Sequence, residues 1–308
     1  MNMPEMREQF RIAFSPKTLS LARLTSLGAI LIFLSVMATA GPAAALVGPS
    51  RLAPEFVPYV VMVLDKTGDS ASYCSASVIA PDIVLTAAHC VSSPSHTQVF
   101  YRGQDDLILF DVESLAIHPD YTPNLGERDL ASIDLALLRL SRPLPPFFKP
   151  VELTDSFQVK AGQPLRIAGY GIASEVAREP PGLLRTGILS VIGPLSPLFV
   201  KLKDPEGRGL GGCTGDSGAP IFAIGSLRLV AVAIRAKGIN GYSCGDVTEA
   251  VLIGPQLPWL HKSIEDLSAP GRPRIWLWLL LLLLAAALAA ILRRTMSRPR
   301  PAVSAEEE

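Results

Sequence analysis

The chain has 308 residues, of which 49% are hydrophobic, and its 28 basic and 28 acidic residues give a formal net charge of zero. This length allows one large domain or two medium ones, and the hydrophobic fraction excludes a disordered chain. The balanced charge gives no support to nucleic-acid binding, which usually comes with a basic excess. The charge is uneven, however: residues 1–45 carry a net +2, residues 46–270 a net −5 and residues 271–308 a net +3.

The first 45 residues are typical of an export signal. A basic stretch ends at Arg23, an apolar core covers residues 27–37, and small residues follow as far as Ala45. This core is short for a membrane span, which needs about 20 residues; an uncleaved N-terminal anchor is the alternative. We therefore predict a signal peptide over residues 1–45, with cleavage after either Ala40 or Ala45.

Residues 275–292 contain no polar side chain apart from the two tryptophans at their beginning, Trp276 and Trp278. As a helix this segment would span about 27 Å, close to the thickness of the hydrocarbon core of a bilayer. Four arginines follow it and two precede it, which favours a cytoplasmic C-terminus. We predict a single transmembrane helix over 275–292, a cytoplasmic tail over 293–308, and an extracytoplasmic (periplasmic or extracellular) domain before them. A buried core helix is the alternative.

The segment from residue 46 to residue 270 has the pattern of an all-β domain. Short runs rich in Val, Ile and Leu alternate with Gly, Pro, Asp and Ser, as in a β-sandwich or β-barrel. Nine such runs lie at residues 59–64, 77–79, 83–86, 107–110, 135–140, 165–168, 187–191, 220–223 and 229–234. Helical periodicity appears only over residues 257–267.

Four cysteines lie in this segment, at positions 74, 90, 213 and 244. Outside the cytoplasm they are expected to form disulfides. Four cysteines allow three connectivities, and proximity along the chain favours 74–90 and 213–244. The sequence contains no Cys/His metal cluster and no glycine loop for phosphates, so we expect neither a metal nor a cofactor.

Three short motifs carry chemistry. They are LTAAHC ending at Cys90, DLALLRL starting at Asp134, and CTGDSGAP ending at Pro220. Hydrolysis by a serine needs a base that removes the hydroxyl proton, an acid that orients this base, and donors for the oxyanion. The motifs supply a histidine, an aspartate and a serine in that order.

These motifs resemble the chymotrypsin/trypsin-like serine proteases over residues 46 to about 267. TAAHC of that family is matched letter for letter at 86–90, DIALL appears as DLALL at 134–138, and GDSGGP appears as GDSGAP at 215–220. The glycine–aromatic–glycine turn is matched at 169–171, and WLHKSI at 259–264 is similar to the C-terminal helix. The resemblance implies two antiparallel six-stranded β-barrels, about 46–155 and 156–267, with the active site between them and a short helix at the end.

The resemblance also implies the roles of individual residues. His89 would be the general base, Asp134 its orienting carboxylate and Ser217 the nucleophile, while the backbone amides of Gly215 and Ser217 would form the oxyanion hole. Disulfides Cys74–Cys90 and Cys213–Cys244 would brace the loop that carries His89 and the substrate pocket.

Activation in this family usually creates a new N-terminal ammonium group that inserts beside the aspartate before the serine. The sequence has no Arg or Lys before an Ile-Val-Gly-Gly segment, but Leu46-Val47-Gly48 lies at a suitable distance from Cys74. We therefore expect Leu46 to become the N-terminus and to pair with Asp216. Cleavage after Ala40 would instead leave a five-residue extension to be trimmed.

The expected substrate pocket differs from that of trypsin-like enzymes. Gly211 stands where those enzymes place an aspartate, and Ile234 replaces part of the usual Ser-Trp-Gly. Both features favour a small or medium apolar side chain. Ala219 replaces the second glycine of GDSGGP, a modest change.

The sequence thus predicts a membrane-anchored extracytoplasmic serine endopeptidase that works through an acyl-enzyme intermediate. Its expected partners are protein or peptide substrates and, through the C-terminal helix, a lipid bilayer, but not nucleic acid. The alternatives are a non-catalytic binding module with the same fold and a serine esterase.

Overall fold

The computed structural model describes residues 46–103, 106–123, 132–155, 157–173, 182–193, 196–238, 242–269 and 275–296. The predicted signal peptide and the part of the predicted tail beyond residue 296 lie outside the described residues. The fold is all-β, and each of the nine apolar runs overlaps a strand.

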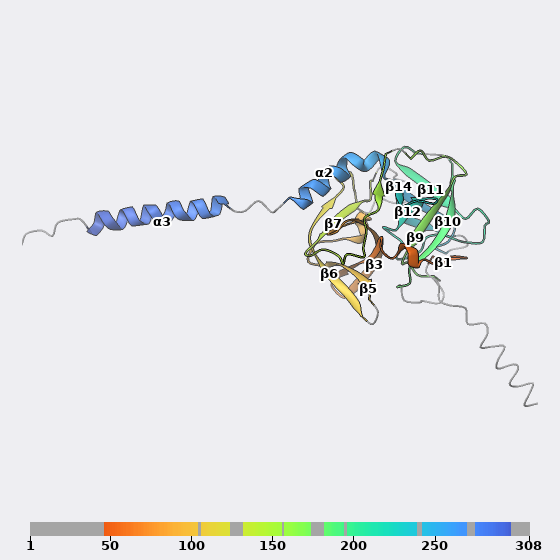
Figure 1. Ribbon diagram of the computed structural model, residues 1–308, viewed down its shortest axis with the longest axis horizontal. Helices are drawn as coiled ribbons and strands as arrows, with labels where there is room; N and C mark the ends of the chain where they lie inside the picture. Colours follow the sequence, from red (N-terminus) through yellow and green to blue (C-terminus); the bar gives the residue numbers. More distant parts are fainter. Residues whose placement is uncertain are drawn as a thin grey trace, which may run out of the picture. The chain divides into compact units, whose positions relative to one another are not determined.

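The first barrel contains six antiparallel strands that close in the order β2-β3-β4-β7-β6-β5 (Figure 1). The strands are β2 (Val60–Thr67), β3 (Ser70–Ala80), β4 (Ile83–Thr86), β5 (Thr97–Arg102), β6 (Leu107–Ile117) and β7 (Ala136–Leu140). All four residues of β4 are buried, which fits its three consecutive apolar residues before Thr86. Because Thr86 pairs with Ala136, the end of β4 and the beginning of β7 lie beside each other.

The second barrel is formed by six antiparallel strands in the cyclic order β9-β10-β11-β14-β13-β12. They are β9 (Pro164–Gly169), β10 (Arg185–Ile192), β11 (Phe199–Lys203), β12 (Pro220–Ala223), β13 (Arg228–Lys237) and β14 (Val247–Leu252). Two short strands are added, β1 (Arg51–Leu52) on β10 and β8 (Glu152–Leu153) parallel to β13.

The two additional strands change the division of the chain between the barrels. Both β1 and β8 precede residue 156, where we expected the second barrel to begin, yet both pair with strands of the second barrel. Leu46 is also fully buried in the hydrophobic core of the second barrel, which we call the second core. The segment around 46–52 therefore belongs to the second barrel, although it precedes the first barrel in the sequence.

Three short 3₁₀ helices, η1 (Pro54–Phe56), η2 (Ala88–Cys90) and η3 (Gly254–Gln256), lie between strands or before helix α2 (Leu257–Ser268). Helix α2 matches the predicted helix over 257–267 and contacts β6 and β7 of the first barrel. Leu260 is fully buried there, and the guanidinium of Arg139 on β7 donates a hydrogen bond to the carbonyl of Leu267. The end of the domain is therefore attached to the first barrel.

Helix α3 (Ile275–Met296) contains the predicted transmembrane segment. In the part of the chain that the structure describes, no helix qualifies as long and apolar enough to cross a membrane. The transmembrane helix is therefore unconfirmed.

Candidate active site

His89 lies in η2, directly after β4, and a disulfide between Cys74 and Cys90 ties η2 to β3. The Nδ1 atom of His89 is 2.6 Å from Oδ2 of Asp134, and the backbone amide of His89 donates to Oδ1 at 2.9 Å. Asp134 stands just before β7, so the pairing of β4 with β7 brings these two residues together. The carboxylate thus fixes both the backbone and the ring of His89.

Ser217 lies in the loop before β12, which is attached to the first barrel by Ser75 on β3. The amide of Ser75 donates to the carbonyl of Ser217 at 2.8 Å, and its hydroxyl donates to the carbonyl of Gly215 at 2.9 Å. The same hydroxyl accepts a hydrogen bond from the amide of Tyr170 at 3.0 Å. Ser75 is fully buried. Its role was not predictable from the sequence, because nothing there distinguishes Ser75 from the other serines of its strand.

Gly218 brings this loop close to the segment before His89. Its φ is +79°, and a Cβ there would lie 2.0 Å from the carbonyl oxygen of Ser75, 2.2 Å from Oγ1 of Thr86 and 3.1 Å from the amide of Ala87. Only glycine fits this space and this backbone conformation. The residue after Ser217 therefore packs against the residues that lead into His89.

The backbone of Gly215 also has a conformation that favours glycine, with φ +95°. A Cβ at this position would be 3.0 Å from the Cα of Gly171. The amides of Gly215 and Ser217 donate no hydrogen bond to another residue in the described part of the chain. Both amides are therefore available to an outside acceptor.

Asp216 is a buried carboxylate held by backbone amides. Its Oδ1 accepts from Gly171 and its Oδ2 from Cys213, each at 2.9 Å. Burial raises the pKa of Asp216 to about 7, although the two hydrogen bonds act in the opposite direction. A Cβ on Gly169 or Gly171 would lie 2.2 or 2.4 Å from this carboxyl group, which explains the glycines of the 169–171 turn. Among the described residues no cation forms an ion pair with it.

Leu46 lies in the same barrel as Asp216. Its side chain is fully buried in the second core together with Ala219, whose amide donates to the carbonyl of Asp216. The next residue, Val47, forms a β-bridge with Gly211. The segment that we expect to become the N-terminus is therefore docked in the second barrel. The methyl group of Ala219 is accommodated in this core.

A small cavity of about 10 Å³ adjoins Ser217, and its walls include Gly212, Ala236 and Thr248. The two residues that the sequence assigned to the pocket do not line it. Gly211 faces Gly245, whose Cα would be 3.0 Å from an added Cβ, and Ile234 packs in the other core cluster.

The position of Ile234 has a physical reason. A β-bulge shifts the register of β13 against β14 between Ala233 and Arg235. A bulge changes which side chains face each side of a strand, and here Ala233, Arg235 and Ala236 line the cavity.

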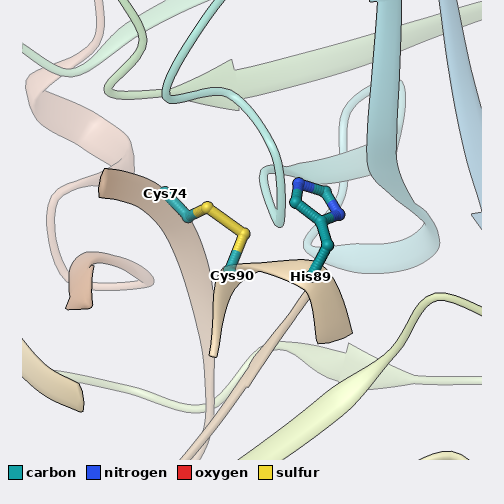
Figure 2. Close-up of side chains that lie close together, drawn as sticks. All are labelled: Cys74, His89 and Cys90. Atoms are coloured by element: carbon teal, nitrogen blue, oxygen red, sulfur yellow. A yellow bond between two sulfur atoms is a disulfide. The ribbon is translucent and has the colours of Figure 1, made fainter. Parts of the chain in front are cut away.

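The second disulfide, Cys213–Cys244, joins the loop of Ser217 to the segment before β14. Figure 2 shows the first disulfide beside the ring of His89. The ligand atoms of Cys74, His89 and Cys90 lie within 4.8 Å of one another. Both sulfurs are oxidised, however, and a metal binds thiolates, so these residues do not fit a metal centre.

Two β-barrels with a histidine–aspartate pair and a glycine-flanked serine loop at their junction have the architecture of a serine peptidase. The protein-family model described as Trypsin matches residues 46–250, which is more than half of the chain. The chain therefore belongs to the trypsin family and is a serine endopeptidase that acts on proteins or peptides.

Relatives of this chain are found in animals. It is 26% identical to serine protease 28 of Mus musculus over 277 residues, which are 80% of this chain and 99% of the relative. It is 28% identical to granzyme M of Homo sapiens, covering 70% of this chain and 88% of the relative. An inactivated protease paralogue of the scabies mite shares the fold, with a TM-score of 0.56, 22% identity, and coverage of 71% of this chain and 99% of that chain.

We predict that Asp216→Asn changes how stability depends on pH. Because the pKa of Asp216 rises from 3.8 to about 7 on folding, its contribution to stability is most favourable below pH 4 and is lost as the pH rises to 7. The loss is at most about 4 kcal/mol, since one pKa unit corresponds to about 1.4 kcal/mol. The measurement is urea unfolding between pH 4 and pH 8 of the wild-type chain and of its Asp216→Asn variant, both with residues 1–45 retained.

The informative quantity is the difference in unfolding free energy between the two proteins at each pH. Burial lowers the pKa of His118, so this group changes the stability with pH in the opposite sense, but it is present in both proteins and its contribution cancels. The wild-type protein should lose stability relative to the variant as the pH rises from 4 to 7. A constant difference would contradict the prediction.

Proposed function

We propose that the peptidase works through a triad of His89, Asp134 and Ser217. The contact of 2.6 Å between His89 Nδ1 and Asp134 Oδ2 is the observation that supports this most strongly. It orients the ring and stabilises the positive charge that the ring acquires when it takes a proton. The packing of Gly218 against Ala87 supports the proximity of Ser217 to His89.

In the proposed reaction, the Oγ atom of Ser217 attacks the peptide carbonyl carbon while its proton moves to Nε2 of His89. The resulting tetrahedral intermediate expels the amine, which takes the proton from His89, and an acyl ester remains on Ser217. Water then attacks the acyl ester while His89 takes its proton. The carboxylic acid is released as that proton returns to Oγ of Ser217. Each proton moves through His89, while Asp134 holds the ring of His89 in place and takes no proton itself.

The free amides of Gly215 and Ser217 are the proposed oxyanion hole. Donors that are fixed before the reaction stabilise the developing negative charge without having to reorganise. The positive φ of Gly215 and its tight contact with Gly171 support this fixed arrangement.

We also propose that export processing after Ala45 leaves Leu46 as the first residue of the mature enzyme. Its ammonium group would then pair with Asp216. The support is the burial of both residues in the second barrel and the cost of an unpaired buried carboxylate. A paired ammonium group lowers the pKa of a carboxyl, so processing would stabilise the loop that carries Ser217.

The remaining proposal concerns location. The apolar run over 275–292, the arginines after it and the helical backbone of α3 support a single-pass membrane anchor with a cytoplasmic tail. The signal-like N-terminus and the two disulfides support an extracytoplasmic protease domain.

Variants of the triad test the proposed mechanism. Asp134→Asn should lower kcat by about 10⁴-fold and Ser217→Ala by at least as much, as expected for a triad. Asp111→Asn is the control, because Asp111 is an exposed residue of β6 that hydrogen-bonds Gln98. The measurement is the rate of peptide hydrolysis by correctly folded protein. Full activity of Ser217→Ala would exclude the mechanism.

Processing and anchoring are tested on one preparation from membranes. The mature chain should stay in the membrane pellet after alkaline carbonate extraction, and its N-terminal sequence should begin at Leu46. A chain truncated after Ser268, the last residue of α2, should be soluble. A start at Gly41 would contradict maturation by export alone, and full-length protein in the soluble fraction would contradict the anchor.

A further inference from the structure

The cavity beside Ser217 is too small for most side chains. Its volume of about 10 Å³ is close to the minimum of roughly 10–15 Å³ that holds one water molecule. Larger cavities of the second barrel, of about 380 and 270 Å³, lie around Val159, Pro197 and Leu252 and do not include Ser217 in their walls. Among these three cavities, the one next to the proposed nucleophile is therefore the smallest, and its size is set by the described residues around it.

Three residues from different segments meet at this cavity. A Cβ added to Gly212 would lie 3.4 Å from Oγ1 of Thr248 on β14 and 3.6 Å from Cβ of Ala236 on β13. The amide of Gly212 donates to Oγ1 of Thr248 at 2.9 Å. Thr248 is almost fully buried. Widening the cavity by moving Thr248 would break this buried hydrogen bond, which is costly.

The charges around the cavity disfavour a basic side chain. Arg235 contributes to the wall, and its Nη1 is 3.2 Å from Oε2 of the buried Glu249, which also binds Lys201 at 3.1 Å. The carboxylate of Asp216 is occupied by backbone amides, and that of Asp246 pairs with Lys203 at 2.7 Å. These carboxylates are therefore already bound to other groups of the protein, whereas the cavity wall contains the positively charged guanidinium of Arg235.

We propose that this cavity accepts only glycine, alanine or serine at the substrate residue whose carbonyl is attacked, and that Ala236 and Thr248 set this limit. The inference rests on the proposed function of Ser217 and narrows its substrate class. A space that holds about one water molecule also holds the methyl group of alanine, whereas leucine, phenylalanine or arginine would have to displace a wall.

The test uses the processed full chain and a series of peptides that differ only at this residue, with Gly, Ala, Ser, Val, Leu, Phe or Arg. The kcat/KM for Ala should exceed that for Leu, Phe and Arg by at least about 100-fold. Ala236→Gly should raise the ratio of Val to Ala about tenfold. Thr248→Ser, which keeps the hydroxyl bonded to Gly212, should shift the ratio in the same direction.

Ala231→Gly is the matched control, because Ala231 is a fully buried residue of the same strand that packs in the second core and not in the cavity wall. It should leave the ratio of Val to Ala unchanged. A ratio of rates on one sample does not depend on the fraction of folded enzyme, so partial unfolding of a variant does not obscure the result.

Labelling of Ser217 by a fluorophosphonate on the same samples separates the two proposals. A labelled wild-type enzyme that prefers Leu, Phe or Arg would overturn the pocket inference and leave the proposed function intact. A folded, processed enzyme that is neither labelled nor active would overturn the proposed function. An Ala236→Gly ratio equal to that of Ala231→Gly would show that Ala236 does not set the limit.

Discussion

The hydrogen bonds of Ser75 join the two barrels at the point where the candidate active site lies. From β3 of the first barrel, this residue binds the carbonyls of Ser217 and Gly215 and the amide of Tyr170, all of the second barrel. Its own carbonyl accepts from the hydroxyl of Thr86, three residues before His89. Because these groups are buried, each would cost about 1–3 kcal/mol if left without a partner. The positions of the serine loop and of the histidine segment are therefore coupled through the backbone and side chain of one residue, Ser75.

The buried carboxylate of Asp216 imposes a second constraint on the same loop. Two backbone amides satisfy its oxygens, and two glycines leave room for it. The amides do not neutralise the negative charge of the carboxylate, which explains why burial still raises the pKa of Asp216. The proposed ammonium group of Leu46 would complete this arrangement, and the side chain of Leu46 already lies in the core of the same barrel. Electrostatics and packing thus favour the same role for the N-terminal segment.

The sequence predicted the strands with continuous apolar runs and the helix at 257–267, because burial determines both patterns. It missed the short strands β1 and β8, and also β5, β11 and β14, whose sequences mix polar or charged residues with apolar ones. In the folded chain Lys201 of β11 and Arg235 of β13 pair with Glu249 of β14 between them, an arrangement that becomes visible only when the strands are placed side by side.

The candidate site was likewise predictable only in part. Local motifs predicted His89, Asp134 and Ser217 as candidates, since each stands in a short stretch of characteristic sequence. The cavity walls were not predictable, because the bulge in β13 decides which side chains face Ser217. The role of Ser75 was not predictable either, because it depends on hydrogen bonds with residues more than 90 positions away in the sequence.

The central claim, that Ser75 couples the barrels and orders the serine loop, is tested most directly by comparing Ser75→Ala with Ser77→Ala. Both serines are fully buried on β3, but the hydroxyl of Ser77 has no hydrogen-bond partner among the described residues. Urea unfolding and kcat of both variants are measured together. Ser75→Ala should lower the free energy of unfolding by about 1–3 kcal/mol and reduce kcat, while Ser77→Ala should leave both close to those of the wild type. Equal effects of the two substitutions on stability and kcat would contradict the account.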